Sequence, residues 1–219
     1  MVDKTKFLGV MIDEYLSFSP HIQYIKGKIS RSLGILYKCK KFFKDSTLVM
    51  LYNAFIYPYF TYCVTVWGNT YSSYLDPLIK LQKRAIRLIA SLPKRSHTET
   101  LFTQYRLLPL AKIYIYSVQL FMYKFHHNKL PAIFSSFYLR NKMVSNRNTR
   151  QSNLFHVPHQ KPDLKSRSVR CTGVTIYNQL FTKLKLDVSI VTYKKYLKSY
   201  LLENEVRLWS YINRYIFTY

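Results

Sequence analysis

Acidic residues are scarce in this sequence of 219 residues, in which 10 aspartates and glutamates stand against 34 lysines and arginines. The acids are scattered, and the neighbours Asp13 and Glu14 would point to opposite sides of a strand. Two-metal phosphoryl transfer needs carboxylates that converge on the ions. We therefore expect no catalytic residues, no metal site and no cofactor in this chain, and we do not expect it to be an enzyme on its own.

Cysteine is also rare, with Cys39, Cys63 and Cys171 too few and too far apart for a disulfide framework. No cysteine pair at zinc-finger spacing accompanies the histidines. A cysteine–histidine or serine–histidine nucleophile stays open, because order along the chain does not test it. The start of the chain has no apolar run typical of a signal peptide. These features favour an intracellular location, in the nucleus or the cytoplasm.

The net charge of +24 is the most informative bulk property. A compact domain with so much charge of one sign repels itself, so a polyanion is expected to offset it. RNA, DNA or an RNA–DNA hybrid fits best, because neutralised phosphates release counterions.

Two alternatives stay open: a structural domain that binds an acidic partner, and a membrane protein anchored through residues 47–67. That segment is long enough to span a bilayer, but Asn53, Pro58 and several threonines and tyrosines lower its apolarity, so we do not expect a membrane partner.

Helical periodicity dominates the sequence. After Pro20, isoleucines and leucines recur from Ile22 to Leu36 at spacings of three and four, which is typical of an amphipathic helix. Further helix starts are predicted at residues 45–47, at Asp76–Pro77, at the capping box of residues 96–99 and at Pro109. Pro58 is predicted to end or kink a helix. The predicted fold is mainly α, with a short N-terminal β-hairpin, a helical bundle and a small helical C-terminal region.

Five segments follow from these patterns. They are a hairpin at 1–19, a helical bundle at 20–95, a helical connection at 96–139, a basic linker at 140–170 and a helical region at 171–219. Within the last segment, residues 174–177 predict a strand or a short helix. Residues 189–202 predict an amphipathic helix whose inward side chains are Tyr193, Tyr196, Leu197, Tyr200 and Leu201.

Two predicted helices carry basic residues without interleaved acids, as a phosphate-binding surface would. Such contacts would be independent of base sequence. The abundant aromatic residues, 21 tyrosines and 14 phenylalanines, could also stack on single strands, although at helical spacing aromatic stripes usually belong to the core. The candidate nucleic-acid-binding residues are Lys26, Lys28, Arg31, Lys38, Lys80, Lys83, Arg84 and Arg87.

Several motifs, taken in order, resemble the region downstream of the catalytic palm in non-LTR (LINE-type) retrotransposon reverse transcriptases. They are Lys6-Phe7-Leu8-Gly9-Val10 with Ile12-Asp13, His21-Ile22, Lys28-Ile29-Ser30, Leu51-Tyr52-Asn53-Ala54 before Tyr57-Pro58-Tyr59, Tyr62-Cys63 with Val66-Trp67-Gly68, residues Leu81 to Arg87, His97-Thr98, and Arg170 to Gly173 before residues Ile176 to Leu180.

This resemblance implies that the hairpin is the end of the palm, with a primer-grip-like role for Phe7, Leu8 and Gly9, and that residues 20–95 are a thumb-like bundle. It also implies an upstream, palm-containing chain as a partner. Members of the parent family are RNA-directed DNA polymerases, and aspartates in their palm bind Mg²⁺. This chain lacks the family's paired aspartates. The resemblance therefore predicts a non-catalytic fragment that grips template and primer.

Overall fold

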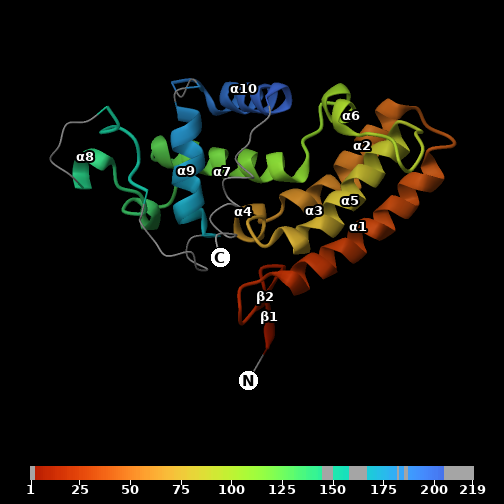
Figure 1. Cartoon of the computed structure of the whole chain (residues 1–219), viewed down its shortest axis with the longest axis horizontal. Helices are drawn as coiled ribbons and strands as arrows, with labels where there is room; N and C mark the ends of the chain where they lie inside the picture. Colours follow the sequence, from red (N-terminus) through yellow and green to blue (C-terminus); the bar gives the residue numbers. More distant parts are fainter. Residues whose placement is uncertain (1–2, 145–149, 158–166, 182, 185–186, 205–219) are drawn as a thin grey trace. The chain divides into compact units, whose positions relative to one another are not determined.

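A computed structural model describes residues 3–144, 150–157, 167–181, 183–184 and 187–204. It is mainly helical, with a single antiparallel pair of strands at the N-terminal end of its described part. The predicted fold class is therefore confirmed (Figure 1). The chain forms two compact units, residues 1–114 and residues 115–219. The division lies inside the predicted helical connection at 96–139.

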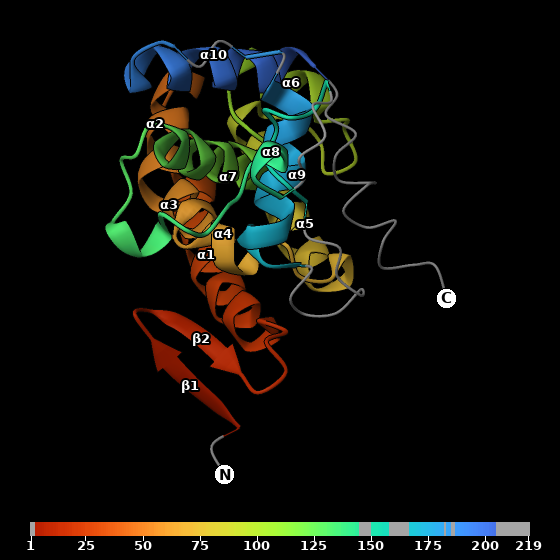
Figure 2. The ribbon, with the colours of Figure 1, turned by 90° about the vertical axis from the view of Figure 1, so that its left-hand side faces the viewer.

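The first unit begins with a hairpin of β1 (Lys4–Phe7) and β2 (Val10–Asp13), joined by Leu8 and Gly9. Both turn residues have positive φ, 45° and 84°. Such a pair suits a two-residue hairpin turn, and glycine adopts this conformation without strain. The buried Val10 holds β2 against α1 (Ser19–Cys39), so the hairpin lies at the start of that helix (Figure 2).

Between β2 and α1 the chain turns around Asp13. Its carboxylate accepts hydrogen bonds from the backbone N–H groups of Ser17 (3.1 Å) and Phe18 (2.8 Å). Burial acts to raise the pKa of Asp13, but the hydrogen bonds from Ser17 and Phe18 outweigh it and leave the pKa lowered. Asp13 therefore shapes the entry into the first helix.

Helix α1 is followed by α2 (Asp45–Phe55), the short helices α3 (Tyr57–Thr61) and α4 (Val64–Trp67), and α5 (Ser72–Ile89). Helix α1 packs against α5, α2 and α3. The periodic residues predicted to be buried in α1, Ile22, Ile25, Ile29, Leu33 and Leu36, are all in the core. Pro58 acts as predicted, because α2 ends before it and α3 has it in its first turn.

Other helix starts were predicted less well. Helix α5 begins at Ser72 and not at Asp76–Pro77, so Pro77 lies inside it. Proline has no N–H group, so the helix loses the hydrogen bond that this position would donate to the Ser73 carbonyl. The loss is tolerated because Ser73 is exposed to solvent. Helix α6 (Glu99–Gln104) starts at the last residue of the predicted capping box, 96–99, so its N-cap is Thr98 and not Ser96. Thr98 makes no side-chain capping hydrogen bond.

A buried glutamine ties α5 to the rest of the first unit. The Gln82 amide nitrogen donates to the Tyr52 hydroxyl (2.9 Å) and to the Leu108 carbonyl (3.0 Å). Its oxygen accepts from the Leu110 backbone N–H (2.8 Å), at the start of α7 (Leu110–His126). Because Gln82 is 1% exposed, these bonds replace water and fix α5 to α2 and to the start of α7.

The second unit contains the later part of α7, a 3₁₀ turn (Ala132–Phe134), α8 (Asn141–Val144), α9 (Val169–Phe181) and α10 (Ile190–Glu203). Its core is aromatic, with Tyr123 stacked on Tyr193 at 4.3 Å. The open choice at residues 174–177 is settled in favour of helix. In α10, Tyr193, Leu197 and Leu201 are buried as predicted, whereas Tyr196 is exposed.

The predicted basic linker at 140–170 contains local structure where it is described. Helix α8 lies in it, and Arg140 forms an isolated antiparallel bridge with Phe155. Residues 145–149 and 158–166 of that segment lie outside the described residues.

Candidate nucleic-acid interface

All eleven candidate binding residues belong to the first unit. Helix α5 presents the clearest arrangement. Its buried stripe consists of Leu75, Leu78, Gln82, Ala85, Ile86 and Ile89. At 3.6 residues per turn, Lys80, Lys83, Arg84 and Arg87 fall on the opposite side within an arc of roughly 100°. We call these four residues the α5 basic face.

The α5 basic face is accessible along its length. Lys80 and Arg84 are exposed, and Lys83 and Arg87 are half-buried. One acid, Asp76, lies on the same side of the helix, one turn before Lys80. The surface is therefore positive but not free of acid, and its positive end is the C-terminal half of α5.

The loop after α5 extends this surface. Arg87 Nε donates to the Ser96 carbonyl at 2.7 Å, which folds the loop back towards the helix. Lys94 and Arg95, both exposed, lie within that loop. They were not among the predicted binding residues, although their position between Arg87 and the next helix start was a usable signal. The folded loop adds two cations near the end of the α5 basic face.

The four candidates on α1 do not share one face. Lys28, Arg31 and Lys38 lie within roughly 80° of one another, whereas Lys26 lies about 160° from Lys28, across the buried stripe. Arg31 and Lys38 are exposed, and the other two are half-buried. The structure therefore groups three of these residues and separates Lys26 from them.

A tyrosine connects the hairpin to the α1 cations. The Nζ atoms of Lys28 and Lys6 lie 5.4 Å and 5.7 Å from the centre of the Tyr24 ring. Cations at this distance are attracted to the face of an aromatic ring. Lys6, which the sequence marked only as part of the hairpin motif, thus joins the same side as Lys28 and Arg31.

The three hairpin candidates lie at the turn between the strands. Phe7 and Leu8 are 63% and 73% exposed, whereas Gly9 packs against the Tyr62 ring. The Tyr62 hydroxyl donates a hydrogen bond to the Leu8 carbonyl. This long-range contact holds the turn, and no sequence pattern pointed to it.

Metal-ligating groups, cysteines and apolar helices can each be located in the described part of the chain. No group of three or more histidine, cysteine or acidic residues there could hold a metal ion. Cys39 and Cys63 are half-buried, Cys171 is buried, and none of the three forms a disulfide. In the same described ranges, no helix combines the length and apolarity needed to cross a bilayer, and residues 47–67 contribute to α2, α3 and α4.

Compared with known protein families, curated proteins and solved structures, the chain matches none of them.

Proposed function

We propose that this chain binds the phosphate backbone of a nucleic-acid duplex through the α5 basic face. Its biological role would be that of a non-catalytic, template–primer-gripping part of a retrotransposon RNA-directed DNA polymerase. The observation that carries the proposal is the gathering of Lys80, Lys83, Arg84 and Arg87 on the side of α5 that faces away from its buried stripe. The family role rests on the sequence motifs alone.

The packing of α5 supports a rigid binding surface. Six residues of the helix are buried, and Gln82 is hydrogen bonded to two other parts of the unit. Cations on a rigid helix lose little further freedom when they meet phosphates, so more of the electrostatic attraction remains as affinity. A backbone-directed surface of this kind suits a protein that follows a duplex without reading bases.

The hairpin has a separate place in the proposal. Phe7, Leu8 and Gly9 would support a primer terminus once an upstream, palm-containing chain completes the polymerase. The exposure of Phe7 and Leu8 and the bracing of their turn by Tyr62 agree with such a role. Primer extension by that upstream chain, assayed with and without this protein, tests the partnership, and equal extension would contradict it.

The direct test reverses the charge of the α5 basic face. The variant with Lys80, Lys83, Arg84 and Arg87 all changed to Glu is compared with wild type for binding to a blunt RNA–DNA hybrid over a range of salt concentrations. We expect a large loss of affinity and a slope of log K against log salt reduced by up to about 3–4, since each lost phosphate contact removes roughly 0.9. A second variant with the four residues changed to Gln separates lost attraction from added repulsion.

A matched control changes Lys124, Lys183, Lys194 and Lys195 to Glu. These four exposed lysines belong to the second unit, and their reversal changes the net charge by the same amount. If both quadruple Glu variants lose the same affinity, only net charge matters and the assignment of the α5 basic face is wrong. Weak, salt-insensitive hybrid binding by the wild type would instead favour an acidic protein partner. Circular dichroism confirms that each variant keeps its helices.

A further inference from the structure

The turn between α1 and α2 displays two adjacent phenylalanines. The backbone N–H groups of Phe42 and Phe43 both donate to the Cys39 carbonyl, at 3.0 Å and 3.1 Å. These bonds close the turn and hold both residues at its tip. Phe42 is 81% exposed and Phe43 is 49% exposed. The turn lies at the end of α1 away from the hairpin (Figure 1).

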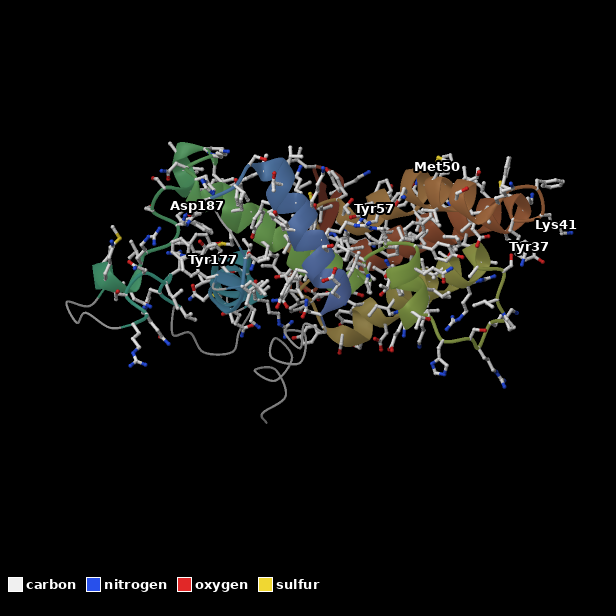
Figure 3. The ribbon with its side chains drawn as sticks, turned by 90° about the horizontal axis from the view of Figure 1, so that it is seen from above. Tyr37, Lys41, Met50, Tyr57, Tyr177 and Asp187 are labelled. Atoms are coloured by element: carbon white, nitrogen blue, oxygen red, sulfur yellow. The ribbon has the colours of Figure 1, made fainter. Side chains whose placement is uncertain are left out.

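Such exposure sets these rings apart from the core aromatics of the same unit. Tyr52, Phe60 and Trp67 are fully buried, as aromatic residues in a helical stripe usually are. At the turn, by contrast, Tyr37 in the last turns of α1 is also 54% exposed. Tyr37 and Lys41 lie at this same end of α1 (Figure 3). The structure thus separates aromatic residues that build the core from those that face solvent, and three of the exposed ones gather at this end of α1.

Lysines surround the exposed rings. Lys38, Lys41 and Lys44 are exposed, and Lys40 is half-buried with its Nζ atom 5.7 Å from the centre of the Tyr37 ring. We call Tyr37, Phe42, Phe43 and these four lysines the α1–α2 tip. Positive charge interleaved with accessible rings is the composition of sites that bind single-stranded nucleic acid.

The acidic residue nearest to these lysines in the sequence is Asp45, and its carboxylate is held by another residue. Asp45 is the only aspartate or glutamate between Tyr15 and Leu75. Its carboxylate accepts a hydrogen bond from the Tyr105 hydroxyl at 2.6 Å. Burial, together with this hydrogen bond, raises the pKa of Tyr105 to about 12, so the hydroxyl keeps its proton and continues to donate. Asp45 is therefore tied to the end of α6, and its single negative charge faces the four lysines of the tip, which leaves the tip positive.

We infer that the α1–α2 tip is a binding site for single-stranded nucleic acid, in which Phe42 and Phe43 stack on unpaired bases while Lys41 and Lys44 contact the neighbouring phosphates. The inference deepens the proposed function and rests on it, because it presumes that the chain meets nucleic acid. A regular duplex keeps its base faces stacked inside the helix. The tip would therefore discriminate between single strands and duplexes, which the α5 basic face would not do.

The test measures binding of the full chain to a fluorescein-labelled oligothymidine and to a blunt RNA–DNA hybrid by fluorescence anisotropy. Phe42→Ala is expected to weaken oligothymidine binding about 5- to 150-fold, the range that loss of one base–aromatic stack gives. Its salt slope and its affinity for the hybrid should stay unchanged, since no charge is removed. Phe42→Trp, which keeps a stacking ring, should retain wild-type affinity for the single strand.

Phe55→Ala is the matched control. Phe55 is a phenylalanine on α2 that is 47% exposed but lies outside the tip, so its loss should leave oligothymidine binding unchanged. Equal losses for Phe42→Ala and Phe55→Ala would show a general effect of surface apolarity and would overturn the inference. Unchanged oligothymidine binding by Phe42→Ala would overturn it as well.

Two further outcomes separate this site from other assignments. If Phe42→Ala loses binding to vesicles of phosphatidylserine and phosphatidylcholine but keeps oligothymidine binding, the tip is a membrane contact and the inference is wrong. If Phe42→Ala loses oligothymidine binding while charge reversal of the α5 basic face leaves hybrid binding intact, the inference stands and the proposed duplex surface fails. The reverse pattern rejects the tip alone.

Discussion

Gly68 follows α4 and is buried, and the space around it requires the absence of a side chain. Its φ of −72° is ordinary, so conformation does not demand glycine there. A Cβ atom at this position would lie 2.7 Å from Cδ2 of Tyr114 and 2.8 Å from Cγ2 of Val64. Close-packed interiors do not absorb such overlaps without shifts of the surrounding atoms. Gly68 is therefore a packing residue between α4 and α7.

We expect Gly68→Ala to lower the free energy of unfolding by about 1–3 kcal/mol through overpacking. The control is Gly34→Ala on the exposed side of α1, where an added Cβ meets nothing within 4 Å. That variant should gain roughly 0.5–1 kcal/mol, because alanine favours a helix more than glycine does. Urea unfolding followed by circular dichroism measures both. Equal effects of the two substitutions would contradict the packing role.

Side-chain exposure is the residue property that the sequence predicted least. In α10, Tyr193 and Tyr196 both fit the predicted inward face, yet Tyr193 is fully buried and Tyr196 is 51% exposed. Likewise, nothing in the residue types distinguishes Phe42, at the tip, from Phe60, in the core. The distinction depends on which neighbouring element covers each ring, and periodicity along one helix does not contain that information.

At the scale of elements, α5 combines a polar residue in its buried stripe with cations on its exposed side. Gln82 occupies a stripe position between Leu78 and Ala85. Its amide group forms hydrogen bonds with Tyr52, Leu108 and Leu110. One side chain therefore connects α5 to α2 and to the start of α7. The periodicity of the leucines and isoleucines predicted the stripe, but the glutamine partners come from segments far along the chain.

We expect Gln82→Leu to destabilise the first unit by on the order of 3 kcal/mol, because the Leu110 N–H and the Leu108 carbonyl would be buried without these partners. Tyr52→Phe removes only one hydroxyl from the same network and should cost about 1 kcal/mol. Unfolding free energies of both variants, measured in urea, provide the check. A Gln82→Leu protein as stable as wild type would show that water or a relaxed backbone replaces the amide.

Basic residues on helices show the same contrast between pattern and arrangement. The α5 candidates span eight residues and lie on one side, as helical spacing alone allows. The α1 candidates looked equivalent in the sequence, but Lys26 lies across the buried stripe from Lys28. The sequence was sufficient to predict this separation. Helical spacing, when it is measured from the buried stripe of Ile22 to Leu36, places the two lysines on opposite sides of that stripe.

For the whole molecule, the dominant property is the charge of +24. A buried histidine, His21, and a half-buried one, His126, add a dependence of stability on pH. In the first unit, His21 is 2% exposed and its Nδ1 accepts from the Met11 backbone N–H at 3.4 Å. In the second unit, His126 Nδ1 lies 2.8 Å from the Tyr177 hydroxyl. Burial lowers the pKa of His21, and burial, followed by His127 and Arg140, lowers the pKa of His126.

Both units should therefore lose stability on acidification. Because the folded-state pKa of each histidine lies below the unfolded value near 6.5, the unfolded chain takes up protons first as the pH falls. The stabilisation is complete above pH 6.5 and declines as the pH falls from there through the folded-state pKa. Thermal unfolding at a series of pH values from about 7.5 to 5 should show this decline.

His21→Asn supplies the control for this prediction. Asparagine offers an acceptor near the position of Nδ1 but does not titrate. The variant should lose the part of the pH dependence that belongs to the first unit and retain the part that belongs to the second. A pH dependence identical to that of the wild type would show that His21 does not contribute.

The sequence by itself determined the helical class, the N-terminal hairpin, the stripe of α1 and the clustering of four cations on one side of α5, because each depends on residue type and local spacing. Only the tertiary structure decided that α5 begins before Pro77, that Tyr62 braces the Leu8–Gly9 turn and that Phe42 faces solvent. These features depend on contacts between residues distant in the chain. Local propensity acts over a few residues, whereas burial and long-range hydrogen bonds are set by whichever segments the completed fold brings together.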